Sequence, residues 1–350
     1  MGLFYAKPGV IGLDIGSQCV KAAQLIRHSK GWSANALAAF KRREPGAALS
    51  TGEALGIADV LRRRGFVGDR VALCAPEDTV VRAVLDLPPE NAQVPRERIV
   101  RVEIARTHRL SPDGFSCCWS QLPASAHNAT PGQALCWALP YEKISPTLSA
   151  LDRAGLQASG VEPNSAALAR SCGAMLSDPS RISAIADLGA SAARLVLLHQ
   201  GRVVHERTLA EWSGDKIASV LSEKWSVPEP LASRAMERFG VDTGGATGLL
   251  ASETAGTITG LLEEMVEQVT LSFSFVSHQY PEAELGPLLL TGGVAGMPGL
   301  AGLLAEGLEL QVVPMSPAVL LAQCPEGRAA TSSAMVSAVG LAMQEVGRHG

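Results

Sequence analysis

Asp14 ends an apolar segment and is followed by Gly16, Ser17 and, after three more residues, Lys21. A glycine lets backbone N–H groups approach a phosphate closely, and a serine adds a hydroxyl group. A carboxylate can hold Mg²⁺ through water, because hard cations prefer oxygen ligands and keep several waters. A lysine can reach a terminal phosphate. By itself the segment is more typical of an ordinary hairpin turn, so its interpretation depends on whether it occurs again.

The pattern does occur again, at Asp187 with Gly189 and Ser191, which is 173 positions further along (187 − 14) in a chain of 350 residues. A strand–Asp–Gly–strand unit repeated at half the chain length predicts two similar subdomains that face each other across a cleft. We interpret the two turns as a phosphate clamp, with Asp14 and Asp187 as water-mediated Mg²⁺ ligands. Ser191 also resembles a nucleophile elbow, but β-like residues follow it instead of a helix, which argues against a hydrolase.

Four further residues are candidates for the same site. Gly292 and Gly293 follow a buried strand predicted at 288–290, and bare backbone there can lie against a nucleoside. Gly214 precedes a predicted helix. Glu162, where the chain crosses between the halves, can order an attacking water as a catalytic residue. A plain turn at 292–293 and a surface acid at 162 are equally compatible with the sequence.

Composition excludes several classes of protein. The net charge is −4 and the pI about 6.0, whereas a nucleic-acid binder is more often basic. The seven cysteines are odd in number and include no C-x-x-C pair, as in a reduced cytoplasmic protein. No signal peptide is visible, and the most apolar window, 288–305, is interrupted by glycines and a proline, so we do not predict a membrane span. No metal site is predicted beyond nucleotide-bound Mg²⁺.

Hydrophobic periodicity and turn residues predict an α/β chain in three parts. The first subdomain takes residues 1–84 and 158–180, with a β-meander, a helix at 51–64 and a strand at 70–74. A small α/β module at 85–157 is inserted, with an Arg-rich helix at 95–109, a strand at 134–139 and a helix opened by Ser145-Pro146. The second half, 181–350, repeats the plan, with a strand pair around Gln200-Gly201, a smaller lobe at 213–284 containing a helix at 259–280, and a last helix at 331–342.

Two Asp–Gly turns and a late Gly–Gly turn, in this order, resemble the actin, Hsp70 and sugar-kinase superfamily. Within it, the chain resembles the PilM family of type IV pilus assembly proteins over nearly its whole length. The segments that carry this resemblance are Met1–Phe4, Ile11–Ser17 with Val20-Lys21, Ala154–Leu156, Val161–Pro163 with Ala166–Ala169, Ala186–Ser191, and Leu290–Gly293 with Pro298–Leu300.

The resemblance implies an actin-like (ribonuclease H-like) fold with a nucleotide cleft and an FtsA-type inserted subdomain. It implies ATP and Mg²⁺ as cofactors and a cytoplasmic place, peripheral on the inner membrane. The implied partner is the cytoplasmic N-terminal tail of a PilN-type bitopic protein, held in a groove between the first subdomain and the insert. The protein would thereby link motor components to the envelope complex. We expect that the protein neither binds nucleic acid nor inserts directly into the membrane. The sequence does not decide between a monomer and a homo-oligomer.

The sequence departs from the family where Ala192, Ala193 and Arg194 replace a phosphate-binding threonine, and where Ser233 replaces a glutamate that faces the ribose. Residues 105–110 are basic where the family is commonly acidic and aromatic. We therefore expect a binding and assembly protein and at most a weak ATPase. A pseudo-ATPase scaffold, an FtsA-like filament or division protein, and a small-molecule kinase of the same superfamily are the alternatives.

Overall fold

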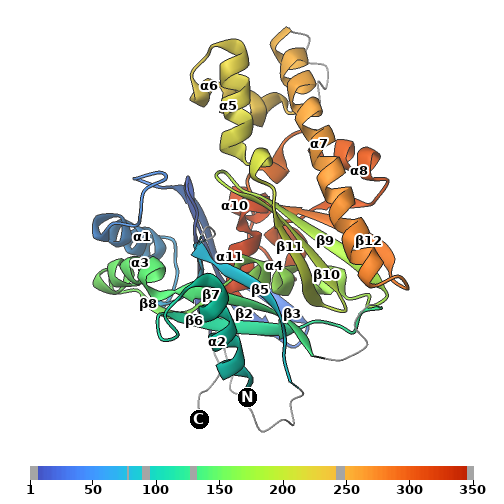
Figure 1. Cartoon of the computed structure of the whole chain (residues 1–350). Helices are drawn as coiled ribbons and strands as arrows, with labels where there is room; N and C mark the ends of the chain where they lie inside the picture. The colour runs from blue at the N-terminus through green and yellow to red at the C-terminus, as the bar shows by residue number, and fades with distance from the viewer. Residues whose placement is uncertain (1–6, 77–78, 89–94, 127–131, 242–248, 345–350) are drawn as a thin grey trace.

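The computed structural model describes residues 7–76, 79–88, 95–126, 132–241 and 249–344. Its frame is a pair of five-stranded sheets with one topology (Figure 1). The first has the order β3-β2-β1-β4-β8, with β1 (Ile11–Ile15), β2 (Cys19–His28), β3 (Gly31–Lys41), β4 (Arg70–Cys74) and β8 (Gln157–Glu162). The second has the order β11-β10-β9-β12-β13, with β9 (Arg181–Leu188), β10 (Ala193–His199), β11 (Arg202–Thr208), β12 (Glu284–Thr291) and β13 (Val312–Pro314).

The two sheets also share their pairing directions. In each, the first three strands along the chain pair antiparallel, and the two later strands join in parallel. The strand equivalent to β1 is therefore β9, and the strand equivalent to β2 is β10. This equivalence confirms the duplication predicted from the two Asp–Gly turns.

Strand β10 shows why strands of the second sheet consist of consecutive apolar residues. Leu195 and Leu197 are buried in one core, beside helix α7 (Leu249–Gln279), while Val196 and Leu198 are buried in another with Leu168. Alternate side chains of a strand point to opposite faces, so a sheet covered on both sides needs apolar residues throughout. Both faces of the second sheet are thus closed by helices.

Helices α4 (Asn164–Cys172) and α11 (Val336–Ala342) pack together between the two sheets (Figure 1). Their contact depends on glycines, which have no Cβ atom. A Cβ added at Gly12 of β1 would collide with the Ala338 carbonyl, and one at Gly340 would collide with the Ala167 carbonyl. These glycines let β1, α4 and α11 approach more closely than any other residue would permit.

The remaining helices take different places around the two sheets. Helices α1 (Thr51–Arg63) and α3 (Tyr141–Arg153) share a core with the first sheet. Later in the chain come α5 (Gly214–Trp225), α6 (Glu229–Phe239), α8 (Leu300–Leu308), α9 (Pro317–Leu320) and α10 (Arg328–Thr331), of which α8 packs on the core of the second sheet and α10 contacts β3 of the first. Short 3₁₀ turns lie at Gly173–Leu176, Ala210–Trp212, Val294–Gly296 and Ser333–Met335. Helices α5 and α6 and the first part of α7 form a lobe that stands away from the second sheet (Figure 1).

The inserted module is a three-stranded sheet of order β5-β7-β6 with α2 (Arg96–His108) on one face. Its strands are β5 (Val81–Asp86), β6 (Phe115–Gln121) and β7 (Gln133–Pro140). The predicted bounds of 85–157 differ from this packing unit at both ends. Strand β5 begins at Val81, and α3 packs instead with α1, where Leu151 shares a core with Ile57.

Two predicted helix bounds were wrong. Helix α3 begins at Tyr141 and not at Ser145-Pro146, because β7 stays paired as far as Pro140 and the chain turns directly into the helix. The Ser145 hydroxyl does not cap the helix and donates to the Tyr141 carbonyl at 2.6 Å. The last predicted helix, 331–342, is broken into α10, a 3₁₀ turn and α11.

The predicted helix at 259–280 is longer than expected and begins at Leu249. No helix in the described part of the chain is both long and apolar enough to cross a membrane. The family-like segment Met1–Phe4 and the chain end at 345–350 lie outside the described residues.

Candidate functional site

The two Asp–Gly turns have the same backbone hydrogen bond. In the first, the Gly16 N–H donates to the Cys19 carbonyl at 3.0 Å, and in the second the Gly189 N–H donates to the Ala192 carbonyl at 2.9 Å. Both pairs are separated by three residues, and each turn joins equivalent strands, β1 to β2 and β9 to β10. The sequence repeat is therefore also a repeat of local geometry.

In the first turn, Lys21 forms an ion pair with Asp14. Lys21 lies opposite Asp14 across β1 and β2, and its Nζ is 2.9 Å from Asp14 Oδ2. Burial by itself would lower the pKa of Lys21, but the charge and hydrogen bond of Asp14, with the charge of Asp187, raise that pKa above its ordinary value. Lys21 is therefore protonated at neutral pH and available to a phosphate.

Ser17 supplies an unused hydroxyl in the same turn. Its Oγ is buried and has no hydrogen-bond partner among the described residues. A buried hydroxyl without a partner is costly, and a ligand oxygen would remove that cost. A Cβ added at the neighbouring Gly16 would lie 2.7 Å from Lys21 Nζ, so any other residue there would displace the lysine.

In the second turn, the carboxylate of Asp187 is hydrogen-bonded from more than one side. Asp187 Oδ2 accepts from Asn164 Nδ2 at 2.7 Å, and Oδ1 accepts from the Thr291 hydroxyl at 3.1 Å. Arg194 lies opposite Asp187 across β9 and β10. Burial raises the pKa of Asp187, and the charge of Arg194 is the largest influence that opposes the rise. Sequence reasoning found Asp187 but missed Asn164 and Thr291.

The two turns lie within electrostatic reach of each other. The charge of Asp14 raises the pKa of Asp187, and the charge of Asp187 raises the pKa of Lys21. Burial raises the pKa of Asp215 at the start of α5, and the side chain of Gln18 from the first turn opposes that rise, so the two halves also influence each other there. The structure thus places Asp14, Lys21 and Asp187 close enough for their charges to act on one another, while their role as a phosphate clamp stays a prediction.

Three predicted glycines have different surroundings. Gly292 has a φ of +89°, and a Cβ there would collide with the backbone of Leu188, so this glycine lets β12 lie close to β9. Gly293 has no atom within 4 Å of an added Cβ and faces open space. The Gly214 N–H donates to the Gly189 carbonyl at 2.9 Å, which docks the start of α5 on the second turn.

Glu162 and Ser191 are placed less favourably. Glu162 ends β8 and forms a two-point ion pair with Arg170, at 2.7 and 2.6 Å, and Arg170 also donates to the Gly340 carbonyl at 2.8 Å. Both carboxylate oxygens of Glu162 are therefore used to fasten α4 and α11, and we do not propose it as a catalytic residue. Ser191 is exposed at the tip of the second turn.

These groups fit a polyphosphate better than they fit a metal ion. Lys21, the Ser17 hydroxyl and the turn backbones are of the kind that bind phosphate. In contrast, the carboxylates predicted as Mg²⁺ ligands are already engaged, Asp14 by Lys21 and Asp187 by Asn164 and Thr291. In the described ranges, no group of three or more histidines, cysteines and acids could hold a metal ion. We therefore assign no metal to Asp14 and Asp187.

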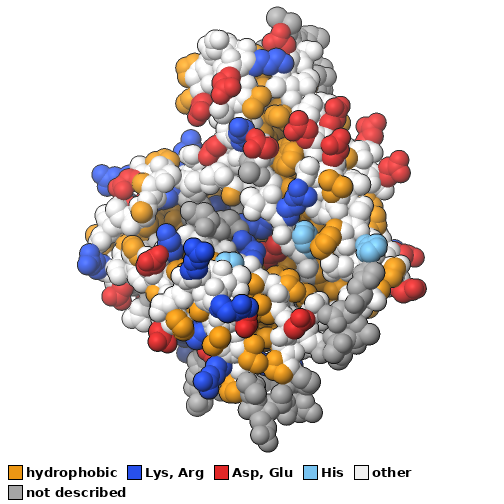
Figure 2. Space-filling view, in the orientation of Figure 1, with side chains coloured by type: hydrophobic (Ala, Val, Ile, Leu, Met, Phe, Trp, Pro, Cys, Tyr) orange, Lys and Arg blue, Asp and Glu red, His pale blue; other side chains and the backbone are white. Residues whose placement is uncertain are grey.

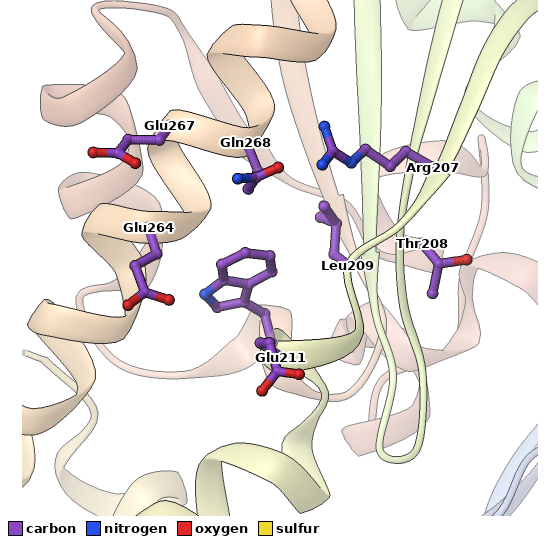
Figure 3. Close-up of a pocket in the computed structure, with 8 residues that line it drawn as sticks. Arg207, Thr208, Leu209, Glu211, Glu264, Glu267 and Gln268 are labelled. Carbon is purple, nitrogen blue, oxygen red and sulfur yellow. The ribbon is translucent and has the colours of Figure 1, made fainter.

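A separate cavity of about 520 Å³ lies on the second half (Figure 3). Glu264, Glu267 and Gln268 of α7 face Arg207 and Leu209 across it. None of the predicted nucleotide-binding residues lines this cavity, so it is distinct from the cleft between the turns. In Figure 2, acidic side chains gather over α7, whereas basic ones gather on the side of α1.

Residues 12–346 match the family model described as type IV pilus assembly protein PilM. The chain belongs to the PilM family. A solved "PilM-PilN type IV pilus biogenesis complex" is similar with a TM-score of 0.76 and 21% identity, covering 96% of this chain and 98% of that one. The ethanolamine utilization protein EutJ from Carboxydothermus hydrogenoformans is similar with a TM-score of 0.52 and 14% identity, covering 96% and 89%.

MreB 5 of Spiroplasma citri bound to AMPPNP is similar with a TM-score of 0.51 and 9% identity, covering 96% and 95%. No curated protein matches the sequence. At these identities the likenesses show the fold, which is the actin-like α/β fold with duplicated mixed sheets. Membership of the PilM family also favours pilus assembly over the kinase and division-protein alternatives.

Proposed function

We propose that this PilM family member is a nucleotide-binding scaffold at the cytoplasmic face of the inner membrane. It binds the cytoplasmic N-terminal tail of a PilN-type bitopic protein and so links motor components of the pilus to the envelope complex. The family match over residues 12–346 and the likeness to a solved PilM–PilN complex support this proposal. The protein itself is peripheral and reaches the membrane through its partner.

The pair of equivalent turns is the observation that carries the nucleotide part of the proposal. Each turn presents its glycine backbone from one half of the molecule, and the first adds Lys21 and the unpartnered Ser17 hydroxyl. A polyphosphate held between them touches both halves. Because a ligand shifts an equilibrium only by its differential affinity for two states, ATP would favour the conformation in which the turns are closest.

The partner tail is proposed to bind as an extended peptide beside the insert. The insert sheet has two edge strands, β5 and β6, and edge strands accept an added strand through backbone hydrogen bonds. We take the insert to be of the FtsA type. The groove that it forms with the first subdomain is the proposed binding place.

A pseudo-ATPase scaffold without nucleotide dependence is the second candidate. The observation that favours it is the pairing of Glu162 with Arg170, which leaves the cleft without a free acid at the end of β8 to order water. The two candidates agree on the partner and differ in whether nucleotide changes partner affinity.

Calorimetric titration of a synthetic PilN-type N-terminal tail into the full chain tests both candidates. We expect binding that is tighter with ATP than after nucleotide has been removed, and a scrambled tail as control that does not bind. Equal affinity in the two states would leave the pseudo-ATPase scaffold. The absence of binding in both states would contradict the scaffold itself.

A further inference from the structure

The second turn contains a cation at the position where the first turn contains Lys21. Arg194 follows Lys21 by 173 positions, the same spacing that separates Asp187 from Asp14. The strand registers agree, since Lys21 pairs with Asp14 and Arg194 pairs with Asp187. Each half thus places one basic residue opposite one acid at the start of the second strand. The repeat extends to charge as well as to backbone.

Arg194 is buried, with 4% of its surface exposed. Its charge acts on Asp187, whose two oxygens also accept from Asn164 and Thr291. The charge of Arg194 thus favours the ionised form of Asp187, and groups of the protein already occupy both of its oxygens. At the other turn, Lys21 does the same for Asp14 at 2.9 Å.

A divalent cation would have to compete with these partners. Mg²⁺ loses its waters reluctantly and is commonly held through one or two carboxylates together with the phosphates. A guanidinium stays charged at every physiological pH, so Arg194 cannot give way by losing a proton. A metal ion beside Asp187 would be repelled by the like charge of Arg194 in a buried site, where such repulsion is poorly screened.

We propose that this protein binds nucleoside polyphosphates without a divalent cation, and that Arg194 supplies at the second turn the positive charge that a metal ion would supply. The proposal rests on the proposed nucleotide site and states the form of ligand that the site takes. Lys21 and the Ser17 hydroxyl meet the phosphates, while Arg194 keeps Asp187 from repelling them. The ligand is then free ATP or ADP, and the metal-bound form has no advantage.

Calorimetric titration of ATP and ADP into the full chain, in excess EDTA and again in Mg²⁺, tests the proposal. For the unaltered protein we expect the two dissociation constants to agree within about threefold. For Arg194→Ala we expect affinity in EDTA to fall by about tenfold or more, with much of it restored by Mg²⁺. Arg194→Lys, which keeps the charge, should remain insensitive to the metal.

Ser17→Ala is the matched control from the first turn. It removes a hydroxyl that meets phosphate and frees no acid, so affinity should fall in both conditions without becoming dependent on metal. If Arg194 had only a structural role, Arg194→Ala would unfold at a lower temperature, but the ratio of the two affinities would not change. Should Arg194→Ala fail to fold, the ratio for the unaltered protein and for Arg194→Lys still decides the matter.

The outcomes separate the two proposals. Binding by the unaltered protein in Mg²⁺ but not in EDTA overturns this inference and leaves the nucleotide site in place. A lack of binding in both conditions overturns the nucleotide site and the inference together. Equal binding in both conditions, with metal dependence appearing only in Arg194→Ala, supports both.

Discussion

At the scale of residues, the acids around the cleft are already paired within the protein. Asp14 is paired with Lys21, and Asp187 accepts from Asn164 and Thr291. Glu162 is paired with Arg170. A paired carboxylate holds its neighbours in place and has little capacity left for water or metal. These contacts give the cleft a fixed set of cations, which suits holding a ligand more than reacting with it.

Glu162→Gln separates a structural role from a catalytic one. The substitution weakens the ion pair with Arg170, which fastens α4 to α11 through the Gly340 carbonyl. Because this pair is partly buried, we expect a loss of about 1–3 kcal/mol in the free energy of unfolding. Urea unfolding measures it, and calorimetry of ATP serves as control. Weakened ATP binding with unchanged stability would contradict the structural role.

Glu53 makes stability depend on pH through its contact with Arg42. Both side chains are almost fully buried, and Arg42 Nε donates to Glu53 Oε1 at 3.1 Å. The hydrogen bond from Arg42 is the largest cause that lowers the pKa of Glu53 below its ordinary value of 4.5. The resulting stabilisation is complete above pH 4.5 and is lost as pH falls through the folded-state pKa.

Glu53→Gln should therefore lower the free energy of unfolding by about 3–5 kcal/mol at neutral pH, because it leaves a buried guanidinium without its counter-charge. Urea unfolding at pH 7 and at successively lower pH measures the effect. The difference between the two proteins should shrink in acid. A difference that stays constant with pH would show that Glu53 does not titrate in this range.

At the scale of elements, local pattern predicted those parts of the fold that local physics decides. Hydrophobic periodicity and turn residues located β4 and α1, and the structure adds that Ser50 accepts from the Glu53 N–H as the cap of α1. The start of α3 was mispredicted because pairing of β7 with a distant strand decides where that strand ends.

The residues of the candidate site also fall into those that a local pattern predicts and those that only the fold brings together. Asp14 and Asp187 could be found because each carries its own glycine turn. Asn164 and Thr291 could not, since they reach Asp187 from 23 and 104 positions away, a separation that no local spacing reports. The one available signal was their place, directly after Pro163 and directly before Gly292.

The contact between β1 and α11 gives a prediction at this scale. Gly12→Ala would force its new methyl group into the Ala338 carbonyl, so we expect a loss of about 1–3 kcal/mol in stability. Gly302→Ala in α8 is the matched control, because a Cβ there meets no atom and alanine favours a helix by about 1 kcal/mol. Thermal unfolding of both variants checks the pair, and equal stability would show that the contact yields easily.

At the scale of the whole molecule, a buried acid is one of the groups that fasten the insert to the second half, together with Arg202, which donates to the Gln121 carbonyl at 2.9 Å. Glu206 of β11 accepts from Arg82 Nε at 2.6 Å and from Trp137 Nε1 at 3.0 Å, and only 2% of its side chain is exposed. Strand β11 pairs with β10, which begins at the second turn. The proposed nucleotide turn and the proposed partner module are therefore linked through one short run of paired strands.

Glu206→Gln tests this link, because the amide keeps the shape but cannot neutralise Arg82. We expect faster amide hydrogen exchange across residues 81–140, with exchange in β1 and β2 unchanged, since their core does not touch the insert. In the calorimetric titration, the variant should bind the PilN-type tail with an affinity that no longer depends on ATP. Retained ATP dependence together with a loosened insert would show that the two halves communicate by another route, such as the packed contact between α4 and α11.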